Sequence, residues 1–198
     1  MYVMVESRNL PEEGVVVRGR WGILHHTFEI EILAAECGSK SLQRLVDILV
    51  DSVEGGALVG HVIPVDVAAV TSYWSDVVKA ASVGDRLLIC ATVDGVIAGT
   101  VQLYLSPEPN APHRGEVYKL LVHREFRNRG IGEALMLALE TEARRHGRSV
   151  LLLDTVQGGA GERLYRRLGW QEIGVVPKHF VDPWGEFKSS VYMMRFLE

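Results

Sequence analysis

The segment Arg127-Asn128-Arg129-Gly130-Ile131-Gly132 combines residue types that can bind a phosphate group. It separates a run of strand-forming residues, 117–122, from a helical pattern that begins at Ile131. The two glycines allow a tight turn, so consecutive backbone N–H groups can converge on an anion at the positive end of a helix dipole. Arginines at 124, 127 and 129 would add local positive charge. The alternative is a plain strand-to-helix turn with surface arginines.

Two common phosphate motifs do not fit this segment. A P-loop requires Gly-Lys-Ser/Thr, and a dinucleotide-binding loop requires G-x-G-x-x-G after the first strand of a Rossmann unit. The pattern here is R-x-x-G-x-G. The net charge of −4 gives no overall basic field, which disfavours nucleic acid and anionic membranes as partners. An anionic ligand would therefore depend on this local segment.

Hydrophobic periodicity predicts the elements that position the segment. Period-2 alternation and β-rich runs predict strands, and apolar stripes at i, i+3, i+4 and i+7 predict helices. Asp94-Gly95 is typical of a two-residue hairpin turn. The predicted strands are 27–33, 86–93, 96–105, 115–122, 150–153, 170–176 and 190–196, and the predicted helices are 39–55, 64–84, 131–146 and 161–168.

This element order predicts an α/β (α+β) fold with a mixed sheet and helices on its faces. The strand–helix–strand unit 115–153 must be parallel and right-handed. Ligands favour the carboxyl ends of such strands, so we expect the chemistry near Val122 and Asp154. The prolines of 106–114 predict a loop. A second loop is predicted over 177–189, and its aromatic residues could form a wall over a substrate.

Length and composition indicate one domain with a sizeable core. Residues 1–22 show no helical period and are interpreted as an N-terminal extension, with the domain over 23–198. Cys37 and Cys90 have no repeated spacing, which disfavours a disulfide framework and a metal site. No run approaches the ~18 apolar residues of a membrane span, and the start does not read as a signal peptide. We expect a cytoplasmic protein.

Three further segments complete a resemblance to a known family. Residues 117–139, Leu151-Leu152-Leu153-Asp154-Thr155, and Leu164-Tyr165-Arg166-Arg167-Leu168-Gly169-Trp170 together resemble the acetyl-CoA core of the GNAT superfamily of N-acetyltransferases. Within it, Gly-Glu-Val-Tyr-Lys-Leu-Leu-Val and the Leu-Asp-Thr that follows are similar to tabtoxin-resistance acetyltransferases. The resemblance implies a mostly antiparallel sheet that is splayed at one parallel strand pair.

The resemblance also implies where acetyl-CoA binds. The pyrophosphate would be held by backbone N–H groups of Arg127, Asn128, Arg129, Gly130, Ile131, Gly132 and Glu133. Leu121 and Val122 would pair with the pantetheine arm as if it were an added strand. An Asn common in the family is replaced by Gly158, so the cofactor amide would be bonded otherwise.

Acetyl transfer to an amine needs a neutral amine and a proton for the departing thiolate. The resemblance implies that Tyr165 donates this proton, and a phenol pKa of about 10 suits the role. A core tyrosine is the alternative. Glu116 and Asp154, at strand ends that face the expected site, could accept a proton from an ammonium, directly or through water. Either could instead only bind the ammonium, or be a solvated charge.

The sequence therefore predicts an acetyl-CoA-dependent N-acetyltransferase that acts on a small-molecule primary amine by direct transfer in a ternary complex. No covalent intermediate is expected, because no cysteine lies in these motifs. Two alternatives stay open, a protein or peptide N-acetyltransferase and a non-catalytic CoA-sensing module. A predicted edge strand near the C-terminus makes a homodimer plausible.

Overall fold

The computed structural model describes residues 6–8, 16–21, 26–33 and 37–197. Its strands are β1 (Glu6–Arg8), β2 (Val16–Trp21), β3 (His26–Ile32), β4 (Arg86–Val93), β5 (Val96–Leu105), β6 (Arg114–Val122), β7 (Val150–Val156), β8 (Gln171–Val181) and β9 (Phe187–Phe196). Its helices are α1 (Ser39–Glu54), α2 (Val67–Ser82), α3 (Ile131–Arg145), α4 (Ala160–Arg167) and a 3-10 turn, Arg124–Phe126. The predicted helices are all present within a few residues of their expected ends.

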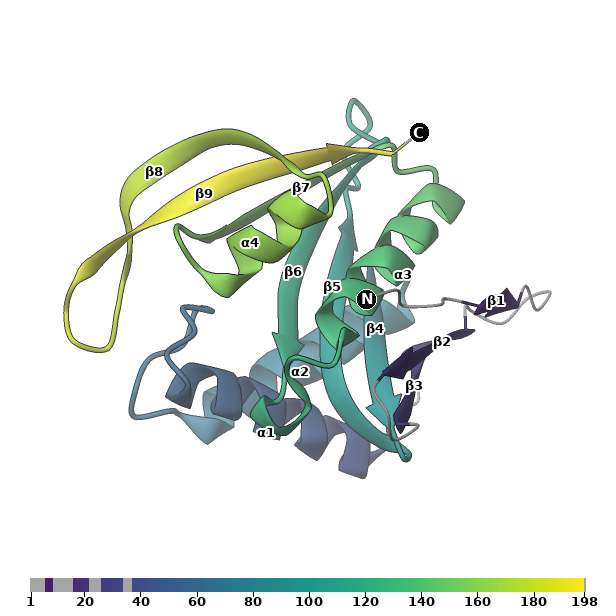
Figure 1. Ribbon diagram of the computed structural model, residues 1–198, viewed down its shortest axis with the longest axis horizontal. Coiled ribbons are helices and arrows are strands. Elements are labelled where there is room, and N and C mark those ends of the chain that lie inside the picture. The colour runs from purple at the N-terminus through teal and green to yellow at the C-terminus, as the bar shows by residue number, and fades with distance from the viewer. Residues whose placement is uncertain (1–5, 9–15, 22–25, 34–36, 198) are drawn as a thin grey trace.

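The nine described strands form one sheet in the order β1-β2-β3-β4-β5-β6-β7-β9-β8 (Figure 1). Only β6 and β7 are parallel, and the other neighbours are antiparallel. The predicted mixed, mostly antiparallel sheet is confirmed. Asp94 and Gly95 have φ values of +51° and +75°, which a tight turn between right-twisted strands requires.

Two hydrophobic clusters cover the two faces of the sheet. Alternate residues of β4 divide between them, with Leu88 facing α1 and α2, and Ile89 facing α3. Trp74 of α2 is fully buried in the first cluster, and Leu135 of α3 is fully buried in the second. Because strand side chains alternate, this pattern places helices on both faces, as the sequence predicted.

The sheet is splayed where β6 meets β7. Parallel pairing covers only three residue pairs and ends at Glu116 and Leu152. Just beyond, β6 carries a bulge, because Lys119 and Leu120 lie between the residues paired with Gln102 and Thr100. Lys119 has φ +51°, in the left-handed region that non-glycine residues rarely adopt. The bulge bends β6 away from β7, since bulges increase local twist.

The predicted loop over 177–189 is wrong. β8 extends to Val181 and β9 begins at Phe187, so these residues form a hairpin that projects from the body of the molecule (Figure 1). Pro177 lies where the β8–β9 register shifts, and a residue without N–H is tolerated at such an interruption on an edge strand. Asp182 closes the turn by accepting hydrogen bonds from the N–H groups of Trp184 and Glu186.

The described parts of the first 22 residues, β1 and β2, continue the sheet beyond β3. The division of the chain at residue 22 stays a prediction. Within the described residues, no helix is long and apolar enough to cross a membrane. No group of three or more His, Cys, Asp or Glu side chains among them is arranged to hold a metal ion.

Candidate active site

The predicted phosphate loop, residues 127–133, leads from the end of β6 into α3. Gly130 is the N-cap of α3 with φ +77°, and no side chain caps the helix. The first intrahelical bond at this end is donated by the N–H of Ala134 to the carbonyl of Gly130. The N–H groups of Ile131, Gly132 and Glu133 precede it and have no helical acceptor. These donors, at the positive end of the α3 dipole, fit an anion such as a diphosphate.

The arginines around this loop do not all add free positive charge. Arg124 and Arg127 both reach Asp51 of α1, while Arg129 lies over the ring of Phe126, 5.3 Å from its centroid. Sequence reasoning missed Asp51, which partly neutralises the two guanidinium groups. The side chain of Glu133 pairs with Arg167 of α4 at 3.3 Å, so of Glu133 only the backbone N–H suits an anion.

Leu121 and Val122 lie at the end of β6, beyond its pairing with β7. They pair on the other side with Thr100 and Gly99 of β5. No strand in the described residues pairs with the opposite edge of β6 after Glu116. An extended ligand could hydrogen-bond there, as in the addition of a strand to a sheet edge. The side chain of Leu121 is buried against α1 and α2, which fixes this edge in place.

Tyr165 of α4 is 7% exposed and packs against Trp170, with ring centroids 5.8 Å apart. Burial raises the pKa of Tyr165, and the negative charge of Asp154 raises it further. The phenol therefore stays protonated across the physiological range. Such a group can donate a proton but is a poor base at neutral pH. The backbone of α4 approaches β7 closely, because a Cβ at Gly161 would lie 2.8 Å from Oγ1 of Thr155.

Asp154 lies on β7, two residues before the strand ends and not at the end as the sequence suggested. Its carboxylate accepts a hydrogen bond of 2.8 Å from Oγ of Ser190, and Nε2 of His179 lies 3.9 Å away. The side chain is one-third exposed. The negative charge of Asp154 also raises the pKa of Tyr165 and opposes the lowering of the Lys119 pKa that burial causes. The structure thus brings this carboxylate near the tyrosine that was predicted to act with it.

Glu116 contacts Tyr118 and Arg114. Its carboxylate accepts a short hydrogen bond from the hydroxyl of Tyr118 and lies 3.7 Å from Nε of Arg114. Burial and this bond raise the pKa of Tyr118 to about 12, so the tyrosine stays a donor. The negative charge of Asp154 also acts on Tyr118, so both predicted carboxylates lie within electrostatic reach of this tyrosine.

Lys119 is a further charged residue near the site that the sequence did not single out. Its ammonium lies 5.4 Å from the ring centroid of Tyr73. Burial lowers the pKa of Lys119, whereas Asp154 raises it. The sequence shows Lys119 as the one Lys or Arg residue in the predicted strand 115–122. Where its side chain points depends on the bulge, which the sequence does not reveal. Tyr73 in turn bonds Gln102 of β5, which connects α2 to this cluster.

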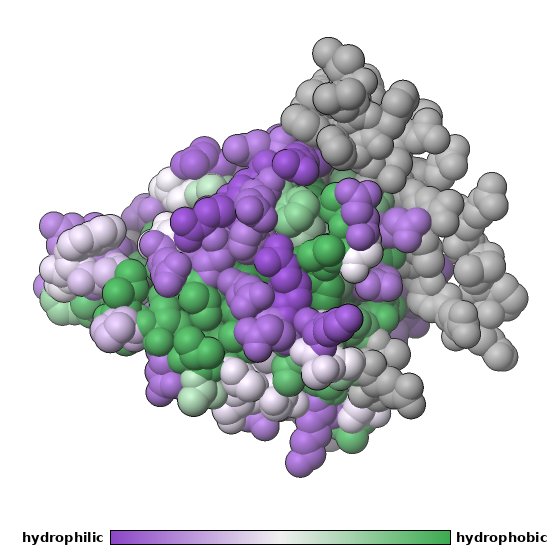
Figure 2. Space-filling model, turned by 90° about the horizontal axis from the view of Figure 1, so that it is seen from below, coloured by the Kyte–Doolittle hydropathy of each residue, from purple (hydrophilic) through white to green (hydrophobic). Residues whose placement is uncertain are grey.

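The hairpin contributes His179 to the region around Asp154. Its ring lies edge-on to Phe180 at 4.5 Å and to Tyr192 at 5.8 Å. Trp184, which was expected to help form an aromatic wall, is 80% exposed at the tip. Figure 2 views the molecule from the side of α1 and α2 and shows hydrophobic residues gathered to the left of a hydrophilic middle. Exposed hydrophobic side chains occur before α2, at Val62 and Ile63, and along the hairpin.

Comparisons with known proteins agree on one family. The model of the acetyltransferase (GNAT) family matches residues 67–170. A protein of Azospirillum brasilense, described as an uncharacterized N-acetyltransferase in the hisH-hisA intergenic region, is 34% identical over 115 residues, which are 57% of this chain and 67% of the relative.

Solved structures share the fold at low sequence identity. The yncA protein of Salmonella typhimurium, solved with its cofactor acetyl-CoA, has a TM-score of 0.68 at 18% identity, covering 86% of this chain and 94% of that one. A ribosomal-protein-alanine N-acetyltransferase of Brucella melitensis has a TM-score of 0.68 at 22% identity, covering 85% and 99%. A GCN5-related N-acetyltransferase of Kribbella flavida has a TM-score of 0.71 at 20% identity, covering 86% and 98%.

The similarity to tabtoxin-resistance acetyltransferases stays a prediction. The family model covers all three segments that carried the resemblance, 117–139, 151–155 and 164–170. The chain therefore belongs to the acetyltransferase (GNAT) family of acyltransferases.

Proposed function

We propose that this acetyltransferase moves the acetyl group of acetyl-CoA to a primary amine of a small molecule, by direct transfer in a ternary complex. One observation carries the proposal. The uncapped start of α3, the unpaired edge of β6 and the buried hydroxyl-bearing Tyr165 follow one another around the splay between β6 and β7. We assign the helix start to the diphosphate, the strand edge to the extended arm, and Tyr165 to protonation of the thiolate.

The binding roles follow from the backbone. N–H groups of residues 128–133 would hold the diphosphate, because that of Arg127 donates to the carbonyl of Arg124 at 3.4 Å. Leu121 and Val122 would pair with the pantetheine arm. The absence of a side-chain cap on α3 supports this, because a capping side chain would compete for the same N–H groups. Acetyl-CoA supplies the activated acyl group as a thioester.

The chemical roles follow from charge and protonation. Asp154 is placed to attract the substrate ammonium and to accept its proton, directly or through water. The neutral amine nitrogen then attacks the carbonyl carbon, the carbon–sulfur bond breaks as the amide bond forms, and the extra proton on that nitrogen passes through water to the Tyr165 phenolate that remains after the thiolate is protonated. Tyr165 gives its proton to the departing thiolate, and the nearby carboxylate of Asp154 opposes any earlier loss of that proton. Glu116 accepts a hydrogen bond from Tyr118, so we give it a smaller role in proton transfer than Asp154.

A thiol-release assay tests the proposal with purified protein, acetyl-CoA and a panel of amino acids, polyamines and peptides with free N-termini. Turnover of a small amine with saturation in both substrates is expected. Turnover of peptides alone would favour peptide N-acetylation instead. If CoA binds tightly and no amine is acetylated, the non-catalytic CoA-sensing module is favoured and the proposed reaction is rejected.

A further inference from the structure

A buried carboxylate on α1 is bonded to the segment that leads into the phosphate loop. Asp51 is 6% exposed and lies on the same helix as the fully buried Leu45, Ile48 and Leu49. Ionised side chains are rarely buried this deeply unless they are paired, because desolvation is costly. The partners of Asp51 therefore explain why an acid occupies a core-facing position.

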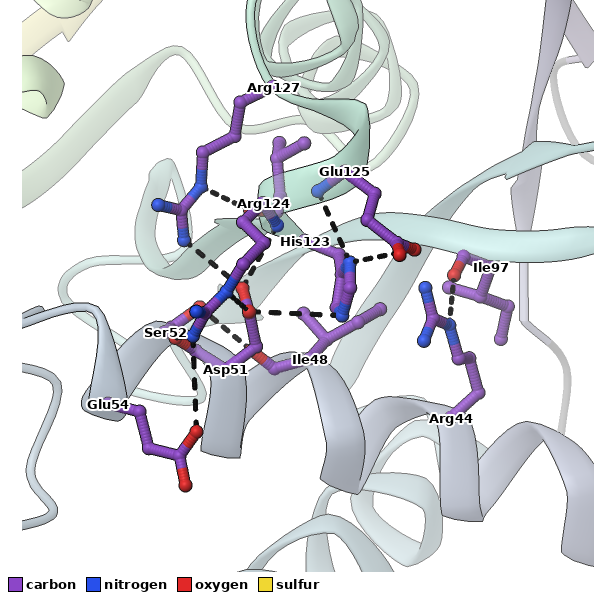
Figure 3. A network of polar contacts seen from close by, with 11 residues as sticks. Arg44, Ile48, Asp51, Ser52, Glu54, Ile97, His123, Arg124, Glu125 and Arg127 are labelled. Carbon is purple, nitrogen blue, oxygen red and sulfur yellow. Dashed lines mark hydrogen bonds and ion pairs between the residues drawn. The ribbon is translucent and has the colours of Figure 1, made fainter.

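Among the residues that the structure describes, the charged partners of this carboxylate all come from one short segment, 123–127 (Figure 3). Oδ2 of Asp51 accepts a hydrogen bond of 3.0 Å from the backbone N–H of Arg124, and Oδ1 accepts a short one from Nε of the same residue. The guanidinium of Arg124 also donates to the carbonyl of Asp51 at 3.2 Å. His123 places Nε2 3.8 Å from the carboxylate.

Arg127 extends the connection to β6. One of its terminal nitrogens donates to Oδ2 of Asp51 at 3.3 Å, while its Nε donates to the carbonyl of Val122 at 2.9 Å. Arg127 thus connects α1 to the end of β6, where the pantetheine arm is proposed to pair. Because both contacts use the guanidinium, its orientation is set by the protein before any ligand arrives.

The charge on Asp51 is maintained by these contacts. Burial alone would raise the pKa of Asp51, but the hydrogen bonds from Arg124 and the charges of His123 and Arg124 lower it below the usual value. The carboxylate is therefore ionised at neutral pH and can orient two guanidinium groups at once. Charge-assisted hydrogen bonds of this kind are stronger and more directional than neutral ones.

We propose that Asp51 is a positioning residue for acetyl-CoA binding, which acts through Arg124 and Arg127 and does not touch the cofactor. It holds residues 123–127 so that the N–H groups of 128–133 converge on the diphosphate. The inference rests on the proposed function. It predicts that Asp51 affects ligands that carry the diphosphate far more than ligands that lack it.

The experiment compares two acetyl donors in the full-length enzyme. Asp51→Asn keeps the shape of the side chain and removes its charge. We expect KM for acetyl-CoA to rise about 10-fold or more, as lost bonds to charged groups imply, whereas KM for acetyl-pantetheine changes less than about 2-fold. Calorimetric titration with CoA should show the same loss of affinity. Asp51→Glu should not restore binding fully, because the longer side chain moves the carboxylate.

Asp47→Asn is the matched control. Asp47 lies one turn earlier on α1, is exposed, and accepts a hydrogen bond of 3.0 Å from Nε2 of Gln43. It should leave both KM values and the unfolding temperature near those of the wild type. If Asp51→Asn does not fold, Arg124→Gln provides the test, because its side chain is 54% exposed and its loss leaves the core filled. Arg124→Gln should show the same selective loss for acetyl-CoA.

The outcomes separate this inference from the proposed function. If the wild type binds CoA and acetylates an amine, but Asp51→Asn and Arg124→Gln leave KM unchanged for both acetyl donors, Asp51 has no positioning role. If both donors lose activity equally, Asp51 is only structural and the inference is wrong. If the wild type itself neither binds CoA nor acetylates an amine, the proposed function fails first.

Discussion

At the scale of single residues, the assignment of proton donor and proton acceptor depends on the burial and the hydrogen-bond partners of each side chain. Tyr165 is buried near a negative charge, which raises the pKa of its phenol, so the proton stays on Tyr165 until a departing thiolate beside it can accept that proton. Asp154 keeps a partly exposed carboxylate, whereas Glu116 is held by Tyr118. These environments favour Tyr165 as the proton donor and Asp154 over Glu116 as the acceptor.

Replacing Tyr165→Phe removes the hydroxyl and keeps the ring against Trp170. We expect kcat to fall about 100-fold or more, because a positioned proton donor contributes about 10²–10⁴. Affinity for CoA by calorimetry should be unchanged, since the backbone donors are untouched. A variant that keeps the wild-type kcat would exclude Tyr165 as the donor and would favour the CoA-sensing alternative.

The pair Asp154→Asn and Glu116→Gln distinguishes the two carboxylates. Asp154→Asn should lower kcat/KM for the amine about 100-fold at pH 7 and recover part of the loss at higher pH. Recovery is expected because a larger fraction of the amine is then already neutral in solution. Glu116→Gln should cost less than about 10-fold. The pH profiles of both variants provide the test, and a larger effect at Glu116 would reverse the assignment.

Sequence reasoning located individual residues where the signal was local. The tight turn at Gly130 and the placement of Tyr165 on a short helix could be read from neighbouring residues. Asp51 could not, because its partner Arg124 is 73 positions away. Lys119 was also missed, since the bulge that turns its backbone depends on pairing with β5. The residues that were missed depend on contacts between distant parts of the chain, which form only when the sheet folds.

At the scale of elements, α1 and the segment after β6 form one unit through Asp51. The pairing of β6 with β7 ends early, so the strand end is supported by β5 and by α1 instead. This arrangement leaves one edge of β6 free while keeping it rigid. The helices and the Asp94-Gly95 hairpin followed from periodicity and turn chemistry. The hairpin of β8 and β9 was not predicted, because Pro177 suggested a loop, whereas β8 continues past a register shift at this position.

The pKa of Asp51 gives this unit a pH dependence. Because the pKa is lower in the folded than in the unfolded chain, its contribution to stability is present above the unfolded value of about 3.9 and is lost as pH falls through the folded value. At neutral pH, Asp51→Asn should lower the free energy of unfolding by about 1–2 kcal/mol, since the half-exposed arginines are screened by water.

The measurement is denaturant unfolding of wild type and Asp51→Asn between pH 3 and pH 7. The difference in the free energy of unfolding should be largest near pH 7 and should narrow below about pH 4. A difference that grows as the solution becomes acidic would mean that the folded state does not favour the ionised carboxylate.

At the scale of the whole molecule, the projecting hairpin leaves β8 as an edge strand of the described sheet (Figure 1). Its exposed hydrophobic side chains include Ile173 (54% exposed) and Val181 (53%). Exposed apolar edge strands favour association with a second strand. We therefore propose that two copies of the chain associate through β8.

Light scattering at increasing protein concentration tests this association. The mass should approach that of a dimer, and Ile173→Lys should shift it toward the monomer, because a charge on the edge opposes strand pairing. An exposed substitution away from β8, Val83→Lys, should have no effect. A monomer at all concentrations, or equal effects of the two substitutions, would contradict the proposal.

The phosphate loop is the part on which the molecular account depends, and NMR titration of the ¹⁵N-labelled protein with CoA tests it most directly. We expect the largest amide shifts at residues 128–133 and along the unpaired edge of β6, with pantetheine perturbing only that edge. Saturable CoA binding that leaves the amides of 128–133 unshifted, or no binding at all, would contradict the proposed diphosphate site.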